Sequence, residues 1–399
     1  MITATETLKI VGRGTVVTSQ PGTEYQSNMA AWVCALTTGR WLATYRAARD
    51  KSNPLQQTMV TWSDDDGRTW RKPFAPFPDR TVNGKIGQFR AMACTALGEN
   101  RVVAAFWWVD TSDPSRPLFN PKTEGVLDSY PFISFSEDGG QSWSEPTLVN
   151  TAPFDQAPCV ICGPVQILPN GVWALSYEIE RVWDRAVDWH PGSAFSYSTD
   201  RGRTWNGGVH AARHPQNLVY YWDQRPSVLA DGTLLDLFWT YDVKSAKYLN
   251  IHAAAARNGG RAWSPLWDTG IAGQPGPARS LPDGRLAMVY VDRAGAPSIK
   301  LRVSDDGGQT WPADTELLIH EAPLPSQLGT KKNLQELWNE LGKYSVGLPD
   351  TKTLPSGDLL VTYYTGSHAD QTDIEWARLS FQPAAPRPVA PLGGKRREK

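Results

Sequence analysis

The amino-acid sequence predicts an all-β fold: a six-bladed β-propeller with recurrent acidic turns and one short inserted helix. Two repeated patterns and the composition predict this class. An eight-residue turn motif recurs five times, and a hairpin built on a glycine turn recurs six times. The chain of 399 residues also contains 18 Trp, 34 Gly and 31 Pro. That density of Trp and turn-forming residues favours many short strands linked by tight turns over a bundle of helices.

The turn motif reads S-x-D-x-G-x-T-W. It begins at Ser63, Ser136, Ser198 and Ser304, and a degraded copy begins at Ala256. Its third position holds Asp65, Asp138, Asp200, Asn258 and Asp306. An Asp carboxylate and a Ser or Thr hydroxyl can bond to the backbone of a turn, Gly permits positive φ, and Trp packs beneath. We interpret the motif as a structural turn rather than a metal or catalytic site, because the copies are too alike to form one site.

The hairpin lies upstream of each motif and occurs once more near the end of the sequence. An apolar strand runs into a turn that contains Gly, and the next strand carries an aromatic residue. The turn glycines are Gly39, Gly98, Gly171, Gly232, Gly284 and Gly357. The aromatic residues are Tyr45, Phe106, Tyr177, Phe238, Tyr290 and Tyr363. A unit of four strands that repeats every 50 to 70 residues, roughly, is typical of a β-propeller, in which each unit forms one blade. Six hairpins and five motifs therefore predict six blades, the last without its own motif.

The repeats predict a single domain over residues 5–383. We expect the last strand, 372–381, to pair with the first, 8–17, because that pairing closes the ring and leaves no long bare sheet edge. An insertion at 312–350 carries an amphipathic helix at 332–344. The Pro-rich and then basic tail, 384–399, has the composition of a disordered segment.

Charge and composition exclude several classes of partner. Lys plus Arg number 40 and Asp plus Glu number 41, which argues against nucleic acid or a membrane surface as partner. The sequence has no apolar run of about 18 residues and no secretory signal at its start, so we expect a cytoplasmic location, or secretion if a leader was removed. Cys159 and Cys162 have metal-like spacing but no second pair, so buried thiols are favoured over zinc. We expect no metal and no cofactor.

The repeated turn motif and the hairpins resemble the Asp-box, or BNR-repeat, proteins of the sialidase superfamily. The resemblance covers nearly the whole chain and implies a six-bladed propeller with its active site around the central axis. In typical sialidases three arginines hold the substrate carboxylate, the first of them at the start of the first inner strand. Met29 stands near that place here, so the chain does not resemble a typical sialidase. The family's tyrosine nucleophile corresponds to Leu348, with Tyr344 close by.

Polar residues at strand starts and loop exits supply the candidate catalytic groups. Asp223 lies nine residues before the fourth hairpin glycine, where the resemblance implies a carboxylate. Glu178 follows a strand of the neighbouring blade, and we take these two acids as the leading pair. Paired carboxylates suit glycoside cleavage, one as acid and the other as base or nucleophile. The resemblance implies Asp50 as a further candidate for the general acid, and Tyr344 completes the catalytic set.

Three arginines, Arg46, Arg90 and Arg225, are candidates for bidentate contacts with a sugar carboxylate or sulfate. The alternative for each is an ion pair with an acid of another blade. Trp108, like its neighbour Trp107, is a candidate for stacking on a sugar ring. Gln88 and Asp350 complete the set expected around the mouth.

These residues predict a carbohydrate-active enzyme. We expect an exo-acting glycoside hydrolase of an acidic or uncommon sugar, with a carbohydrate as its partner and neither nucleic acid nor membrane. Two alternatives stay open. One is a polysaccharide lyase that uses Tyr or His as base beside an arginine-neutralised uronate. The other is a non-catalytic propeller that binds a glycan or a protein. The sequence does not determine the oligomeric state.

Overall fold

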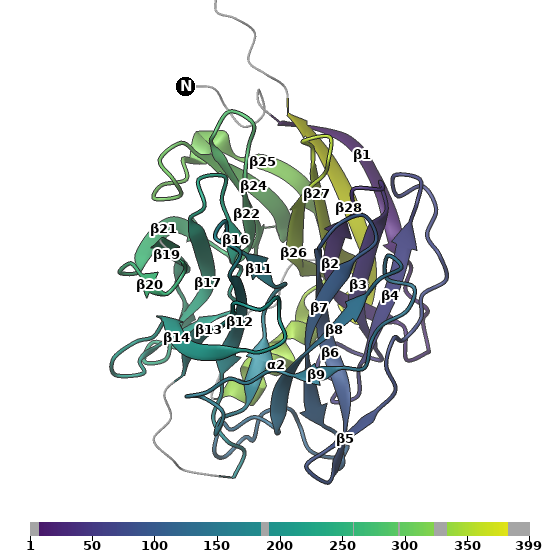
Figure 1. The fold of residues 1–399 in the computed structure, drawn as a ribbon, viewed down its shortest axis with the longest axis vertical. Helices are drawn as coiled ribbons and strands as arrows, with labels where there is room; N and C mark the ends of the chain where they lie inside the picture. Colours follow the sequence, from purple (N-terminus) through teal and green to yellow (C-terminus); the bar gives the residue numbers. More distant parts are fainter. Residues whose placement is uncertain (1–7, 185–190, 258, 294–295, 323–332, 382–399) are drawn as a thin grey trace, which may run out of the picture.

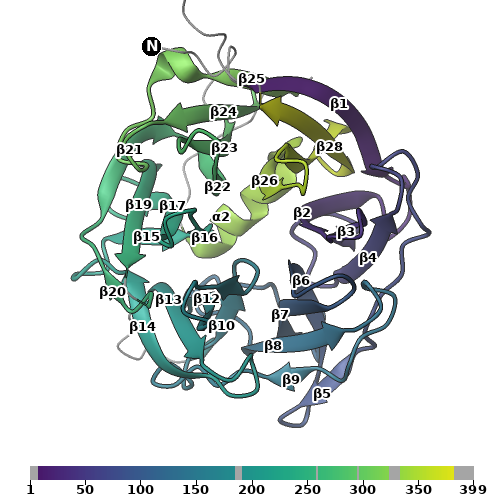
Figure 2. The same cartoon turned by 45° about the horizontal axis from the view of Figure 1, so that its top comes forward.

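The computed structural model describes residues 8–184, 191–257, 259–293, 296–322 and 333–381. Strands dominate these ranges, so the all-β prediction is confirmed. The sheets follow one another around a ring in chain order, and the helix α2 lies at its centre (Figures 1 and 2). Within the described residues, no helix has the length and apolar character that a membrane crossing requires.

Hydrogen bonding divides the strands into five sheets. The first joins both ends of the chain and contains β26 (Val346–Thr353), β27 (Leu359–His368), β28 (Gln371–Phe381), β2 (Ser27–Ala35), β3 (Trp41–Ala48) and β4 (Gln57–Ser63), with β1 (Leu8–Val17) paired to β28. The pairing of β1 with β28 is antiparallel, so the predicted contact between the terminal strands is confirmed. A single parallel pair, Ser27 with Thr372, joins β2 to β28. This one link merges two strand groups, which the sequence pattern separates, into one seven-stranded sheet.

The other four sheets each come from one continuous stretch of chain. The second contains β5 (Arg80–Val82), β6 (Lys85–Ala96), β7 (Val102–Asp110), β8 (Ser129–Ser136) and β9 (Thr147–Leu148). The third contains β10 (Cys159–Ile161), β11 (Gln166–Ile167), β12 (Trp173–Ile179), β13 (Gly192–Ser198) and β14 (Asn206–Ala212). Tight turns join β6 to β7 and β11 to β12, as the glycines Gly98 and Gly171 predict, whereas longer segments join β7 to β8 and β12 to β13.

The fourth sheet contains several short strands that pair with β17 or β19. It contains β15 (Val219–Trp222), β16 (Ser227–Val228), β17 (Leu234–Asp242), β18 (Lys247–Tyr248), β19 (Asn250–Arg257), β20 (Ala262–Trp263) and β21 (Trp267–Ala272). The fifth contains β22 (Gln274–Ser280), β23 (Leu286–Asp292), β24 (Ser298–Ser304) and β25 (Leu317–Glu321). The core lies between the sheets. The six aromatic residues predicted to follow the hairpins are all buried there.

The segment 312–350, which the sequence pattern places outside the repeat, is only partly an insertion. A short 3-10 helix, η1 (Ala313–Thr315), leads into β25, and β25 pairs with β24 as the fourth strand of its sheet. The predicted helix is present as α2 (Leu334–Glu340), followed by the 3-10 turn η2 (Leu341–Lys343). Asn333 caps α2, because its side chain accepts a hydrogen bond from the backbone nitrogen of Glu336 at 2.9 Å.

The acidic turns have the structural role that the sequence predicts. In the first, Asp65 Oδ1 accepts hydrogen bonds from Ser63 Oγ at 2.8 Å and from the backbone nitrogen of Thr69 at 2.9 Å. Gly67 has φ +79°, and Trp70 Nε1 donates to its carbonyl at 3.2 Å. The same carboxylate pattern recurs at Asp138, Asp200 and Asp306. Hydrogen bonds from Thr69 lower the pKa of Asp65 to about 2. Asn258, the third position of the degraded copy, lies outside the described residues.

Replacing one of these acids tests their structural role. Asp306 bonds to the hydroxyl of Ser304 and to both the backbone nitrogen and the hydroxyl of Thr310. Asp306→Ala removes all three bonds, so we expect the free energy of unfolding in urea to fall by about 1–3 kcal/mol. The control is Asp305→Ala, which removes the neighbouring exposed carboxylate. A loss no greater in Asp306→Ala than in the control would contradict the structural role.

Candidate functional site

Two adjoining cavities of about 110 Å³ and 90 Å³ lie where the inner strands begin. We call them the central cavities. They share a polar floor and an apolar roof, formed by Arg46, Phe119, Glu178, Glu180, Asp223, Trp338 and Leu348. The roof comes largely from α2 and η2, whose Leu334, Leu337 and Leu341 line the larger cavity. Trp338 Nε1 donates to the carbonyl of Ser52 at 3.4 Å, which ties the helix to the first sheet's loop.

A recurring irregularity in the inner strands shapes this floor. In three sheets the register shifts at one point where β2, β6, β22 or β26 pairs with the next strand. In the third and fourth sheets the inner strand is interrupted at the corresponding point, between β10 and β11 and between β15 and β16. At this point Ala30, Ala91, Asp223 and Leu348 all have φ between +46° and +56°. A β-bulge of this kind redirects a side chain out of the regular alternation. Ala30, Ala91, Asp223 and Leu348, which lie at these irregular points, all line the central cavities.

Asp223 and Glu178 meet at this floor. Asp223 follows β15 directly, and its backbone nitrogen donates to Glu178 Oε1 at the end of β12. The Asp223 carboxylate accepts a hydrogen bond from Gln274 Nε2 on β22, and its Oδ1 lies 3.5 Å from Arg225 Nη2. Residues of three sheets thus meet at Asp223, Glu178 at its backbone nitrogen and Gln274 and Arg225 at its carboxylate. Asp tolerates the left-handed conformation better than most residues do, which suits it to this position.

The environment of Glu178 favours its protonated form. Burial, together with the nearby Asp223 carboxylate, raises the pKa of Glu178 to about 8. Glu180 lies two positions later and therefore on the same face of the chain. Its carboxyl group is buried, and in the described part of the chain its Oε2 has no hydrogen-bond partner. Burial and the neighbouring Glu178 raise the pKa of Glu180 as well.

Two of the three predicted arginines line the central cavities. Arg46 on β3 donates from Nη1 to Gln56 Oε1 at 3.2 Å, and its guanidinium lies 5.9 Å from the Trp338 ring centre. Burial lowers the pKa of Arg46 to about 10, although the Asp223 carboxylate opposes this shift. Arg225 lines the smaller cavity and donates to the carbonyls of Cys162 and Gln224, each at 3.1 Å. Both guanidinium groups stand beside the acid pair.

Arg90 lies behind the cavity wall instead. It is fully buried, it donates to the carbonyl of Pro54, and its guanidinium lies 5.5 Å from the ring centre of Trp107, which lines the smaller cavity. Burial lowers the pKa of Arg90 to about 9, and the charge of Arg46 acts in the same direction. All three arginines are buried, so none of them forms an ion pair at the surface.

Besides Arg90, five predicted residues are absent from the lining of the central cavities: Asp50, Gln88, Trp108, Tyr344 and Asp350.

Trp108 is fully buried within the second sheet, where Nε1 donates to the carbonyl of Arg80 at 2.9 Å and the ring stacks on Tyr130. It offers no face to a sugar. Its neighbour Trp107 reaches the cavity instead, because successive side chains of a strand point to opposite faces. Asp350 is also structural, since its Oδ2 accepts a hydrogen bond from the backbone nitrogen of Val33 at 3.0 Å.

Tyr344 is buried and donates to Glu340 Oε2 at 2.6 Å, and the Arg293 guanidinium lies 4.0 Å from its ring centre. Burial raises the pKa of Tyr344. Asp50 closes its own turn, accepting from the backbone nitrogen and hydroxyl of Ser52 at 2.9 and 2.8 Å. Gln88 lines a separate pocket.

Apart from Trp107, the predicted residues did not include the aromatic side chains that line the central cavities. Phe119, Trp222, Trp239, Tyr248 and Trp338 line the larger cavity. Glu180 follows the same predicted strand as Glu178, so the sequence places both acids at one loop exit, although only Glu178 was assigned a catalytic role. No sequence signal places α2 above the site, because the spacing of apolar residues predicts a helix but not where that helix packs.

The described residues contain no group of three or more His, Cys, Asp or Glu side chains able to hold a metal ion. Cys34, Cys94, Cys159 and Cys162 are all free and buried. The Sγ of Cys162 lies 3.3 Å from the carbonyl of Val160.

Comparison with known proteins agrees with this architecture. Residues 119–351 match the family model described as a BNR repeat-like domain. Because the match spans more than half of the sequence, the chain belongs to this family. No curated protein sequence matches the chain significantly.

Similar solved structures share the fold at low sequence identity. A protein of unknown function from Dyadobacter fermentans superposes with a TM-score of 0.70 at 17% identity, covering 94% of this chain and 99% of that one. The NanB sialidase of Streptococcus pneumoniae gives 0.61 at 12% identity, covering 92% and 70%. The intramolecular trans-sialidase of Ruminococcus gnavus gives 0.60 at 14% identity, covering 92% and 97%.

The raised pKa of Glu178 predicts a pH-dependent effect on stability. In the unfolded chain the carboxyl ionises near its ordinary value of 4.5, whereas in the folded state it stays protonated up to about pH 8. The folded state therefore binds more protons between these values, and Glu178 lowers the stability progressively as the pH rises through that window. Glu178→Gln removes this penalty and keeps a carbonyl acceptor for Asp223. We expect the melting temperature of the variant, relative to wild type, to rise from pH 5 to pH 8.

Glu99→Gln is the control, because Glu99 is an exposed carboxylate outside the site. Its melting temperature should follow that of wild type at every pH. A constant difference between Glu178→Gln and wild type across the window would rule out the raised pKa.

Proposed function

We propose that this protein is a glycoside hydrolase that removes a terminal acidic or uncommon sugar, and that its sheets form a six-bladed propeller. In this interpretation the seven-stranded sheet counts as two blades, β2–β4 and β26–β28 with β1, because one parallel pair alone joins them. The observation that carries the function is the direct contact of Glu178 with Asp223 beside two buried guanidinium groups.

The two carboxyl groups have environments that suit opposite roles. Glu178, protonated at neutral pH, supplies the proton to the oxygen of the leaving group. Asp223, oriented by Arg225 and Gln274, acts on the other side as base toward water or as nucleophile toward the anomeric carbon. Two acids held in different environments are a recurring solution for cleavage of a glycosidic bond.

The arginines account for the acidic character of the proposed sugar. Within the described residues Arg46 Nε has no hydrogen-bond acceptor, although it is buried. A carboxylate or sulfate of the substrate would satisfy this donor and remove the cost of leaving it unpaired. The small volume beneath α2 supports an exo-acting enzyme, because a continuous polysaccharide would need an open groove.

A non-catalytic glycan-binding protein is the second candidate. One observation favours it: Tyr344, the residue near the family's tyrosine position, has its hydroxyl bonded to Glu340 and does not line the central cavities. Such a protein would use the same arginines and Trp residues to hold a sugar without cleaving it.

Substitution of the acid pair distinguishes the two candidates. The substrates are aryl glycosides of acidic and neutral sugars and acidic oligosaccharides. We expect Asp223→Asn and Glu178→Gln each to lower kcat by about a hundredfold or more on any glycoside that the wild type cleaves, because each removes a proton-transfer or nucleophilic group. Glu99→Gln should retain full activity. Intact binding of an acidic sugar in both site variants, without turnover by the wild type, would identify a binding protein instead.

The pH profile of cleavage tests the role of Glu178. A general acid must be protonated to act. The basic limb of the kcat profile should therefore begin at about pH 8, and kcat should fall about tenfold for each further pH unit. A profile whose basic limb instead begins near pH 4–5 would assign the acid role to a carboxyl group with an ordinary pKa.

A further inference from the structure

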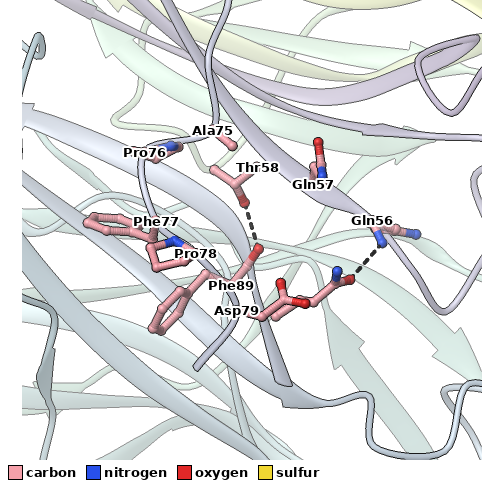
Figure 3. Close-up of a pocket in the computed structure, with 10 residues that line it drawn as sticks. Gln56, Gln57, Thr58, Ala75, Pro76, Phe77, Pro78, Asp79 and Phe89 are labelled. Carbon is pink, nitrogen blue, oxygen red and sulfur yellow. Dashed lines mark hydrogen bonds between the residues drawn. The ribbon is translucent and has the colours of Figure 1, made fainter. Parts of the chain in front are cut away.

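A second pocket, of about 510 Å³, lies apart from the central cavities between β4 and β6 (Figure 3). It shares no lining residue with them. Its walls are Gln56, Gln57, Thr58, Ala75, Pro76, Phe77, Pro78, Asp79, Gln88 and Phe89. Thr58 Oγ1 donates to the carbonyl of Phe89 at 2.9 Å and joins the two strands at the base of the pocket. We call it the outer pocket.

The polar wall of the outer pocket offers free donors and a free acceptor. Gln88 Oε1 accepts from the backbone nitrogen of Gln56 at 3.2 Å, so its amide nitrogen remains available as a donor. Gln57 is exposed, and its Oε1 accepts from the hydroxyl of Tyr25 at 3.3 Å, which leaves its nitrogen available too. Asp79 is exposed, and no hydrogen bond or ion pair joins its carboxylate to another residue that the structure describes.

The opposite wall is apolar and rigid. The rings of Phe77 and Phe106 are stacked with centroids 4.9 Å apart, and Phe89 meets Phe77 edge-on at 5.5 Å. Pro76 and Pro78 flank Phe77 in the sequence and in the pocket (Figure 3). Proline restricts the backbone on both sides of the ring. The Phe77 ring is therefore held in place before any ligand arrives, which lowers the entropic cost of binding.

The chemistry of these walls indicates the ligand. No Lys or Arg lines the outer pocket, so nothing in it neutralises an anion. A carboxylate accepts from two adjacent hydroxyl groups, amide nitrogens donate to hydroxyl oxygens, and an aromatic ring packs against the C–H face of a sugar. The volume lies within the range of small-molecule sites, about 300–1,000 Å³. The complement is a neutral polyhydroxylated ring.

We propose that the outer pocket binds a neutral hexose unit of a glycan, at a site distinct from the central cavities. This inference does not depend on catalysis by Glu178 and Asp223. Gln56 provides a physical link between the two sites. Its backbone nitrogen holds Gln88 in the outer pocket, and its buried side chain accepts the hydrogen bond from Arg46 of the central cavities. A glycan bound at the outer pocket thus rests against the residue that orients Arg46.

Binding of lactose, maltose and cellobiose tests the proposal, with saturation-transfer NMR for detection and titration calorimetry for affinity. We expect at least one of the three to bind the wild type. Asp79→Ala and Gln57→Ala should each weaken that binding at least fivefold, because each removes a group that meets a sugar hydroxyl. Both residues are exposed, so the variants should melt at the wild-type temperature.

Two further variants complete the design. Asp305→Ala, which removes an exposed carboxylate from a turn outside the pocket, should bind as the wild type does. Glu178→Gln should also bind normally, whatever its effect on cleavage. The proposal is overturned if none of the three disaccharides binds, or if Asp79→Ala and Gln57→Ala bind like the wild type. It is also overturned if Glu178→Gln abolishes binding, because that result would place the bound sugar in the central cavities.

Discussion

The hydrogen bond from the backbone of Asp223 to the carboxyl group of Glu178 is the contact on which the site depends. It joins the third and fourth sheets at the point where the inner strand of each is interrupted. Asp223 has a left-handed backbone at this interruption, so both its peptide group and its side chain leave the regular pattern of a strand. Backbone strain of this kind persists where surrounding structure fixes it, here through Gln274 and Arg225.

Charge and burial reinforce one another around this contact. Three carboxyl groups and two guanidinium groups share a small space beneath an apolar helix, so each group strongly affects the protonation of its neighbours. Glu180 Oε2 and Arg46 Nε stay without hydrogen-bond partners within the described residues. Buried groups left in this state cost stability, and a ligand that satisfies them recovers that cost on binding. The apolar side chains of the helical roof keep water away from these buried groups.

Much of this arrangement follows from the sequence, because repetition is a strong signal. The acidic turns, the hairpins and the pairing of the terminal strands all follow from local patterns that recur. Asp223 was predictable because it keeps a fixed distance from a hairpin glycine, and Ala30 and Leu348, at the same distance, share its backbone conformation. Trp108 and Asp350 were misplaced because polarity or size near a strand end does not reveal which face a side chain takes. Trp107 and Trp108 differ by one position and lie on opposite sides of β7. The docking of α2 depends on tertiary contacts such as that between Trp338 and Ser52, which no local period encodes.

The most direct test of the central contact is the ionisation of Glu178 itself, followed by NMR of the ¹³C-labelled side-chain carboxyl group and assigned with Glu178→Gln. We expect Glu178 to titrate near pH 8 in the wild type and at a lower pH in Asp223→Asn, where the neighbouring charge is gone. A titration near pH 4.5 in both proteins would show that the two carboxyl groups do not share a buried site, and the proposed chemistry would fall with that result.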